Sequence, residues 1–104
     1  MTSVIIPTSV KNVEAFAFAW CKNLKEVVIQ SNLSKIDESV FKGCTNLQSI
    51  ILPNTISTIG NEAFSGSGLT SLSIPNNVNF IDDCAFEDCK NLKTIIINRP
   101  ANLD

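Results

Sequence analysis

A fixed spacing of apolar residues runs through the chain. Leading apolar residues recur at intervals of 23, 23, 22 and 23 residues, at Met1, Leu24, Leu47, Leu69 and Leu92. Counted from each leading residue, positions 4, 6, 10, 13, 17, 18 and 21 are also apolar in the four full repeats, with Ser67 as the one exception. Such self-similarity is typical of a repeat architecture, in which stacked copies share one continuous core.

Positions 4 and 6 predict a short strand in each repeat. Two apolar residues that are two positions apart, such as Val4 and Ile6, point to the same face of a strand. Proline follows at position 7 in three repeats, as Pro7, Pro53 and Pro75. Because proline cannot donate to a strand ladder, it is expected to end the strand. The strands of successive repeats should then pair in a parallel ladder, about 4.8 Å apart.

A second wall is expected at positions 17 and 18 of each repeat. These positions hold Ala17-Phe18, Val40-Phe41, Ala63-Phe64 and Ala85-Phe86. We expect this wall to be a short helical or 3-10 turn. A Cys-x-Asn-Leu segment, such as Cys21 to Leu24, then returns the chain to the next strand. The predicted fold class is therefore an α/β-type solenoid, with strands on one side and short helical turns on the other.

The repeat resembles a known family. Thr70 to Asn91, with the sequence TSLSIPNNVNFIDDCAFEDCKN, is similar to the BspA-type leucine-rich repeat, and the likeness extends from residue 1 to about residue 98. The resemblance implies a leucine-rich repeat solenoid, a right-handed superhelix with a parallel strand ladder. Members of this family occur mostly on bacterial and protist cell surfaces. The resemblance therefore implies a cell-surface or secreted adhesion protein that binds a host extracellular protein.

The repeats define a single domain over residues 1–104. The boundaries are 1–23, 24–46, 47–68, 69–91 and a partial repeat at 92–104. The third repeat is one residue short at Ser65-Gly66-Ser67-Gly68, and its two glycines predict a looser turn. Residues 99–104 are expected to form a partial cap or to fray. The first repeat begins with core residues and no polar cap, so we expect preceding repeats, another chain, or homo-oligomers formed through uncapped ends.

Composition excludes several classes of function. The chain has 104 residues, a net charge of −2 and scattered Lys and Arg, which gives no electrostatic basis for binding nucleic acid. Its aliphatic runs are too short for membrane insertion, and no signal peptide is visible at its start. With no histidine and no tyrosine, the chain lacks the commonest catalytic base and metal ligand. We therefore predict no enzyme activity, no catalytic residues, no cofactor and no metal.

Cysteines and acidic residues also have ordinary structural interpretations. Cys21, Cys44 and Cys89 share position 21, where parallel side chains disfavour disulfides and a small apolar core role is expected. Cys84 lies at the variable position 16 and should be the most accessible thiol. Four acids of the fourth repeat, which could in principle hold Ca²⁺, are better interpreted as a solvated face. These acids are Asp82, Asp83, Glu87 and Asp88.

Position 5 supplies the candidate binding surface. It points away from the core, yet it holds four β-branched aliphatic residues in five repeats: Ile5, Val28, Ile51, Ser73 and Ile96. At one strand spacing per repeat, this stripe would be about 19 Å long. A small polar rim is expected beside it at position 3, including Glu26, Ser49 and Ser71. An apolar stripe with a polar rim is typical of a protein-binding surface, although β-propensity alone also favours branched residues in strands.

Two hypotheses of function remain open. In the first, the chain is a protein-binding module whose concave strand face takes a protein ligand. In the second, it is a structural or spacer repeat array, or a self-associating scaffold, without a dedicated ligand. Trp20 is expected to be partly exposed, either covering the first repeat or marking a contact.

Overall fold

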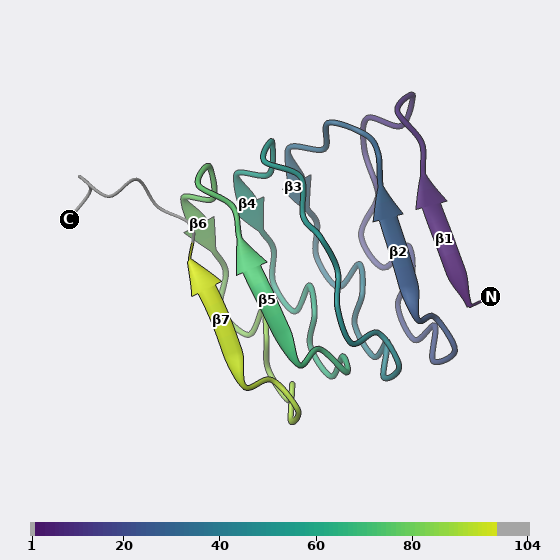
Figure 1. Cartoon of the computed structure of the whole chain (residues 1–104), viewed down its shortest axis with the longest axis vertical. Helices are drawn as coiled ribbons and strands as arrows, with labels where there is room; N and C mark the ends of the chain where they lie inside the picture. The colour runs from purple at the N-terminus through teal and green to yellow at the C-terminus, as the bar shows by residue number, and fades with distance from the viewer. Residues whose placement is uncertain (1, 98–104) are drawn as a thin grey trace.

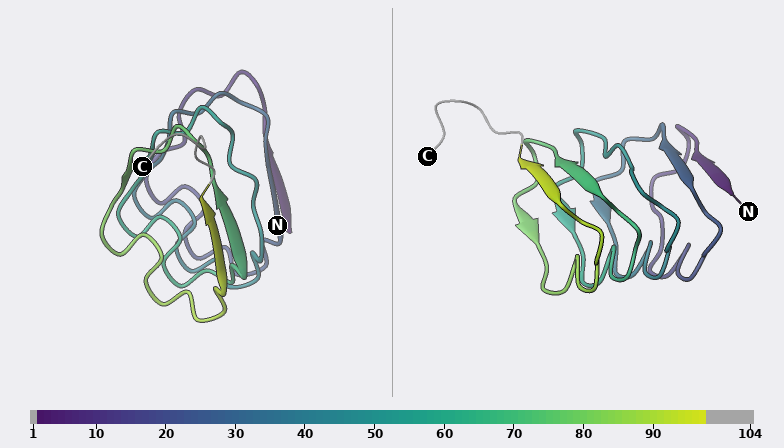
Figure 2. Two further views of the ribbon diagram at one scale, coloured as in Figure 1. Left: turned by 60° about the vertical axis from the view of Figure 1, so that its left-hand side comes forward. Right: turned by 60° about the horizontal axis from the view of Figure 1, so that its bottom comes forward.

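The computed structural model describes residues 2–97 and forms a solenoid of about four coils (Figure 1). The left view of Figure 2 shows the coils one behind another along the stack. Each coil contributes to two walls, one made of the longer strands and one made of turns and shorter strands. The strands are β1 (Ser3–Ile6), β2 (Glu26–Ile29), β3 (Lys35–Ile36), β4 (Thr58–Ile59), β5 (Ser71–Ile74), β6 (Phe80–Ile81) and β7 (Thr94–Ile97).

The four longer strands occupy positions 3 to 6 of their repeats, as the apolar pattern predicts. β1 pairs with β2 and β5 pairs with β7, both in parallel and with equivalent positions side by side. Val4 lies beside Val27, for example, and Leu72 lies beside Ile95. β1 and β5 each end at the residue before a proline, as predicted. β2 ends at the same repeat position before Gln30, so the strand also ends there without a proline.

The expected ladder is not continuous. The third repeat carries no strand at 49–52, and within residues 2–97 no backbone hydrogen bond links this segment to β2 or β5. A second parallel ladder, which the apolar pattern did not predict, joins β3, β4 and β6 at positions 12 and 13. The stack is therefore held by two separate sets of strand pairs on different sides of the coil (Figure 1).

The prediction of helical or 3-10 turns, and with it the α/β description, is wrong: residues 2–97 contain no helix. The Ala-Phe wall consists of consecutive β-turns, closed in the first repeat by the N–H groups of Ala17, Ala19 and Cys21. Positions 16 and 20 adopt left-handed backbone conformations in all four repeats, with φ of 64° at Phe16 and 65° at Trp20. A helix cannot continue through such residues, and the intervening N–H groups bond sideways to the next coil instead.

The core lies between the two walls and runs along the stack. Leu24, Leu47 and Leu69 at position 1 are each completely buried. The phenyl rings of position 18 stack along the solenoid axis, with centroid separations of 5.7, 5.5 and 5.8 Å in the order Phe18, Phe41, Phe64 and Phe86. The two inner rings are fully buried, whereas the two outer rings are only partly covered. One core therefore serves all repeats, as the spacing predicts.

The short turn of the third repeat, Ser65 to Gly68, is closed by backbone hydrogen bonds. The Ser67 N–H donates to the Phe64 carbonyl over 3.0 Å, and the Gly68 N–H donates to the Cys44 carbonyl over 3.1 Å. A side chain at Gly68 would overlap the Thr45 carbonyl oxygen, so glycine is required there. The expected loosening is thus not seen in the hydrogen bonding of this turn, and the irregularity of the third repeat lies in segment 49–52.

Residues 99–104, for which a partial cap or fraying was expected, lie outside the described residues. In the described part of the chain no helix is long and apolar enough to cross a membrane.

Candidate functional site

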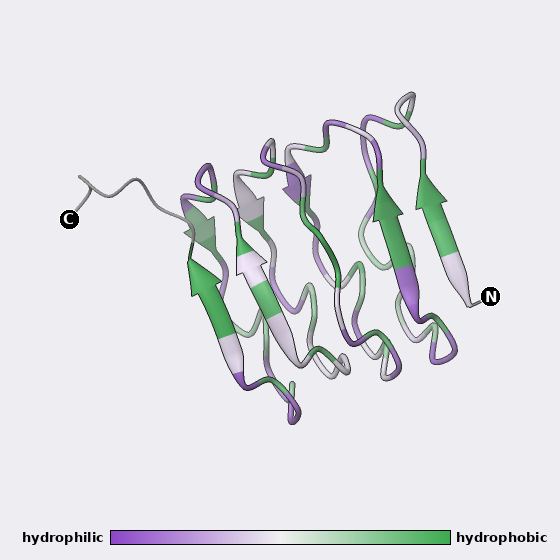
Figure 3. Ribbon diagram, in the orientation of Figure 1, coloured by the Kyte–Doolittle hydropathy of each residue, from purple (hydrophilic) through white to green (hydrophobic). Residues whose placement is uncertain are grey.

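The position 5 side chains lie on the outer surface of the strand wall, which we call the strand face. The parallel register places Ile5 beside Val28 and Ser73 beside Ile96. Ile5 is 60% exposed and Ile96 is 50% exposed, whereas Ile6 in the alternate orientation is only 4% exposed. Figure 3 shows the hydrophobic colouring that extends along β1, β2 and β7. The structure therefore places the stripe residues on one surface, in the order that the sequence predicts.

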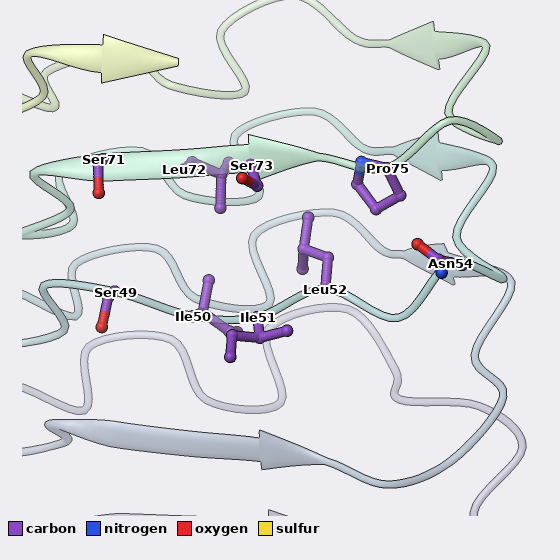
Figure 4. Close-up of a pocket in the computed structure, with 9 residues that line it drawn as sticks. All are labelled: Ser49, Ile50, Ile51, Leu52, Asn54, Ser71, Leu72, Ser73 and Pro75. Atoms are coloured by element: carbon purple, nitrogen blue, oxygen red, sulfur yellow. The ribbon is translucent and has the colours of Figure 1, made fainter. Parts of the chain in front are cut away.

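Ile51 is the most exposed of these side chains, at 86%. It lies in the unpaired segment 49–52, between β2 and β5 (Figure 4). Its side chain points away from those of Ile50 and Leu52, which are buried in the core. Because the segment makes no ladder with either neighbour, its exposed isoleucine stands alone at the centre of the strand face.

A hollow lies on each side of segment 49–52. One hollow, of about 370 Å³, separates the segment from β5 and is lined by Ser49, Ile51, Ser71 and Ser73 among others. The second, of about 300 Å³, separates the segment from β2 and includes Glu26 and Val28. Both hollows are open to solvent and mix aliphatic side chains with small hydroxyls. The missing pairing of segment 49–52 thus leaves two hollows in the strand face, where a regular sheet would be flat.

The rim residues Glu26, Ser49 and Ser71 are all exposed. Figure 4 shows the Ser49 and Ser71 hydroxyls on the same side of their two neighbouring segments. Glu26 is the one ionisable group among the stripe and these rim residues. Apart from Glu26 and the exposed Lys25, which both line the hollow beside β2, this surface offers apolar contact and neutral hydrogen bonds. These stripe and rim residues include no nucleophile paired with a base.

A feature that the sequence analysis missed lies on the opposite wall. The Lys42 ammonium is 2.6 Å from a Glu62 carboxylate oxygen and 5.3 Å from the centroid of the Trp20 ring. Trp20 is 48% exposed and packs over Gly43, where an added Cβ would lie 3.4 Å from the ring. Trp20 therefore contacts the next repeat, and the three side chains link three successive repeats. Trp20, Lys42 and Glu62 hold positions 20, 19 and 16 of three successive repeats. Because these positions share the turn wall, an alignment of the repeats could have indicated the cluster.

The cysteines are free thiols with different environments. Cys44 is fully buried, Cys21 and Cys89 are half-buried, and Cys84 is exposed, as expected from its variable position. The Cys84 thiol lies near carboxylates, of which Glu87 has the largest effect, and their charge raises its pKa. Asp83, Glu87 and Asp88 are exposed and Asp82 is half-buried. Among the described residues no group of His, Cys, Asp and Glu side chains could hold a metal ion.

Comparison with known proteins places this geometry in a family. The model of the BspA type leucine-rich repeat region matches residues 1–103. A comparison with curated protein sequences finds no match. Among solved structures, a leucine-rich repeat protein from Bacteroides ovatus is 36% identical with a TM-score of 0.87 over 91% of this chain.

Two further solved structures are similar over most of the chain. A leucine rich cell surface protein from Faecalibacterium prausnitzii is 34% identical with a TM-score of 0.89 over 97% of this chain. A leucine-rich repeat protein from T. pallidum is 32% identical with a TM-score of 0.87 over 90%. The chain spans 25%, 27% and 44% of the lengths of the three proteins, in the order given. The chain belongs to the BspA-type leucine-rich repeat family.

Proposed function

We propose that the chain is a protein-binding module whose strand face takes a protein ligand. The observation that carries this proposal is Ile51, an aliphatic side chain that is 86% exposed between two hollows. An isolated exposed aliphatic residue is ordinary. A row of four aliphatic residues on one surface, at Ile5, Val28, Ile51 and Ile96, exposes apolar area that a partner could bury.

The chemistry of the strand face defines the kind of partner. Among the stripe residues and the rim residues Glu26, Ser49 and Ser71, only Glu26 is ionisable. Such a surface suits a protein segment that inserts aliphatic or aromatic side chains and receives hydrogen bonds from small hydroxyls. The two hollows beside Ile51 give separate places for two such side chains. Binding, not catalysis, is the role that this set of side chains supports.

Adhesion at a cell surface is the setting we propose for this binding. Membership of the BspA-type family supports it, as does the similarity to a protein from Faecalibacterium prausnitzii that is itself named a cell surface protein. A host extracellular protein would then be the ligand.

The second candidate function is a spacer array without a ligand. β-branched residues are favoured in strands whether or not they are covered, so a spacer would tolerate the same stripe. Segment 49–52 argues for the first function, because Ile51 keeps its exposed aliphatic side chain where no strand pairing exists. A spacer would bind no ligand through this face.

The proposal is tested by a double substitution, Val28→Asp with Ile51→Asp, and by capture of purified host extracellular proteins. Both side chains are exposed, so the variant should fold normally. The matched control is Ala15→Asp with Asn61→Asp, at exposed residues of position 15, where Glu38 and Asp83 are already acidic. We expect the wild-type chain and the control to capture the same protein and the stripe variant to lose it. Capture by all three chains, or by none, would contradict the proposal.

A further inference from the structure

Four lysines that are scattered along the sequence share one corner of the folded coil. Each repeat is joined to the next by a short link, which begins at position 21 and ends at position 2 of the following repeat. The links 21–25, 44–48, 67–70 and 89–93 lie one after another along the lower edge of the stack in Figure 1, which we call the link edge. The first and last links share the sequence CKNLK and supply Lys22, Lys25, Lys90 and Lys93.

The local structure of the links turns these lysines toward solvent. In the three full-length links the N–H of position 1 donates to the carbonyl of position 21, as in the bond of 3.1 Å from Leu24 to Cys21. The leucine at position 1 enters the core, and Leu24, Leu47 and Leu69 are completely buried. All four lysines are exposed. Lys25 is exposed although a repeat lies on each side of it, so the link edge is open within the stack and not only at its ends.

The link edge is basic although the chain as a whole is acidic. Its four links contain four lysines and no Asp or Glu, for a charge of +4, whereas the whole chain carries −2. Widening the count to the adjoining positions 19, 20 and 3 gives five lysines against three acids, which is still +2; the added residues are Lys42, Glu26, Glu87 and Asp88. Within residues 2–97 none of the four edge lysines forms an ion pair. Their charge is therefore available to an anionic partner.

The two lysine pairs are held at a defined separation. Backbone hydrogen bonds join position 2 of neighbouring repeats, from Lys25 to Thr2 over 2.7 Å and from Lys93 to Thr70 over 3.0 Å. Residues of position 2 therefore stand in a column along the stack. Lys25 and Lys93 are three coils apart in this column, which corresponds to about 14 Å at one strand spacing per coil.

Neutral hydrogen-bonding groups lie between the two lysine pairs. Thr45, Asn46 and Gln48 of the second link are exposed. The third link is one residue short, and a hollow of about 150 Å³ lies beside it. This hollow is lined by two glycines and by Thr45, Ser67, Asp88, Lys90 and Asn91. The link edge thus combines separated positive charges with amide and hydroxyl groups.

We propose that the link edge binds a linear sulfated polysaccharide that lies along the stack. Sulfate groups pair with the two lysine pairs, and sugar hydroxyls bond to the amides and hydroxyls between them. Nucleic acid fits less well, because the links contain no aromatic side chain for stacking with a base and no arginine. An acidic peptide finds no apolar pocket here, because the leucines Leu24, Leu47 and Leu69 are buried in the core. This site is separate from the position 5 stripe and does not rest on the proposed protein ligand.

Binding to immobilised heparin, measured by surface plasmon resonance at low and at physiological salt, tests this proposal. The edge variant is Lys22→Gln with Lys90→Gln, at two exposed lysines that line neither hollow of the strand face. The matched control is Lys11→Gln with Lys35→Gln, which removes the same charge from exposed lysines outside the link edge. We expect the control to bind like the wild type and the edge variant to lose about 10-fold in affinity, and the affinity of the wild type should fall as salt is added.

Chemically desulfated heparin should bind none of these chains, because the lysines then lack anionic partners. A wild-type chain that does not bind heparin at low salt would overturn the proposal. Equal losses in the edge variant and the control would overturn it too, because binding would then follow net charge and not the link edge. Tighter binding to polyglutamate or to single-stranded DNA of equal charge would assign the edge to another class of partner. Lys25→Gln with Lys93→Gln is a second edge variant that should reproduce the loss, and circular dichroism checks the folding of each variant.

Discussion

The thiol of Cys44 donates a hydrogen bond of 3.1 Å to the backbone carbonyl of Phe18 in the preceding repeat. Cys89 makes the equivalent bond to Phe64 over 3.0 Å. Cys44 and Cys89 therefore do more than fill apolar space, because they also connect successive turns of the Ala-Phe wall. Ser67, which replaces cysteine in the third repeat, contacts the Cys89 sulfur at 3.5 Å instead.

We expect Cys44→Ala to lower the free energy of unfolding by about 2 kcal/mol, because it removes a buried sulfur and an inter-repeat hydrogen bond together. Cys89→Ala should cost less, since Cys89 is only half-buried. Urea denaturation in a reducing buffer measures both. The matched control is Cys84→Ala, which alters an exposed thiol and should leave stability unchanged. Equal effects at all three positions would contradict a stabilising role for both the burial and the hydrogen bonds of these thiols.

Burial raises the pKa of the Cys44 thiol from 9.0 to about 11. Below pH 9 the thiol is protonated in both states and has no effect on the pH dependence. Between pH 9 and 11 the unfolded chain releases this proton while the folded chain retains it, so stability should fall as the pH rises. The measurement is the difference in unfolding free energy between wild type and Cys44→Ala. That difference should shrink across this interval, and a constant difference would refute the prediction.

Ser39 combines a left-handed backbone, with φ of 55°, and a buried hydroxyl that has no hydrogen-bond partner among residues 2–97. Ser39→Gly relieves both, and after the entropy cost of glycine in the unfolded chain we expect a gain of about 1 kcal/mol. Ser39→Ala removes the hydroxyl but keeps the backbone strain, so it should gain less. Thermal unfolding of the two variants compares these contributions. A less stable glycine variant would show that the serine is not strained.

Phe41 is the inner ring of the phenyl stack, with neighbours at 5.7 and 5.5 Å and no exposed surface. Phe41→Ala should cost about 3–5 kcal/mol because a cavity would open at the centre of the shared core. Phe80, which is 54% exposed, is the matched control, and Phe80→Ala should change stability by less than about 0.5 kcal/mol. Chemical denaturation gives both values, and similar costs would contradict the shared core.

Much of the architecture could be predicted because it depends on spacing. The strand positions and the proline stops follow from where apolar residues and prolines recur. The structure confirms the strand positions in four of the five repeats, and a strand ends before a proline in two of the three repeats that have one. The consecutive β-turns of the turn wall could not be predicted in the same way. They depend on left-handed backbone at positions 16 and 20, which hold residue types as different as Phe16, Trp20 and Glu62. The one available indication was glycine at Gly43 and Gly66, the same position in two repeats, which favours a positive φ.

The missing strand pairing of segment 49–52 could not be predicted from the sequence either. Its residues Ser49-Ile50-Ile51-Leu52 suit a strand at least as well as Ser71–Ile74, which does form one. Pairing depends on how neighbouring coils are placed relative to each other, which local composition does not encode. The position 5 stripe could be predicted because alternation along a strand fixes which side chains point outward. The hollows beside Ile51 could not, because they follow from the missing pairing.

The affinity of one captured ligand for three matched chains is the measurement that tests the binding function of the strand face most directly. Biolayer interferometry would compare the wild type, the Val28→Asp with Ile51→Asp variant, and the Ala15→Asp with Asn61→Asp control at equal protein concentration and salt. We predict that the stripe variant loses about 100-fold or more in affinity, because two carboxylates would be buried without partners, while the control matches the wild type. Equal affinity for all three chains would contradict a ligand site on the strand face.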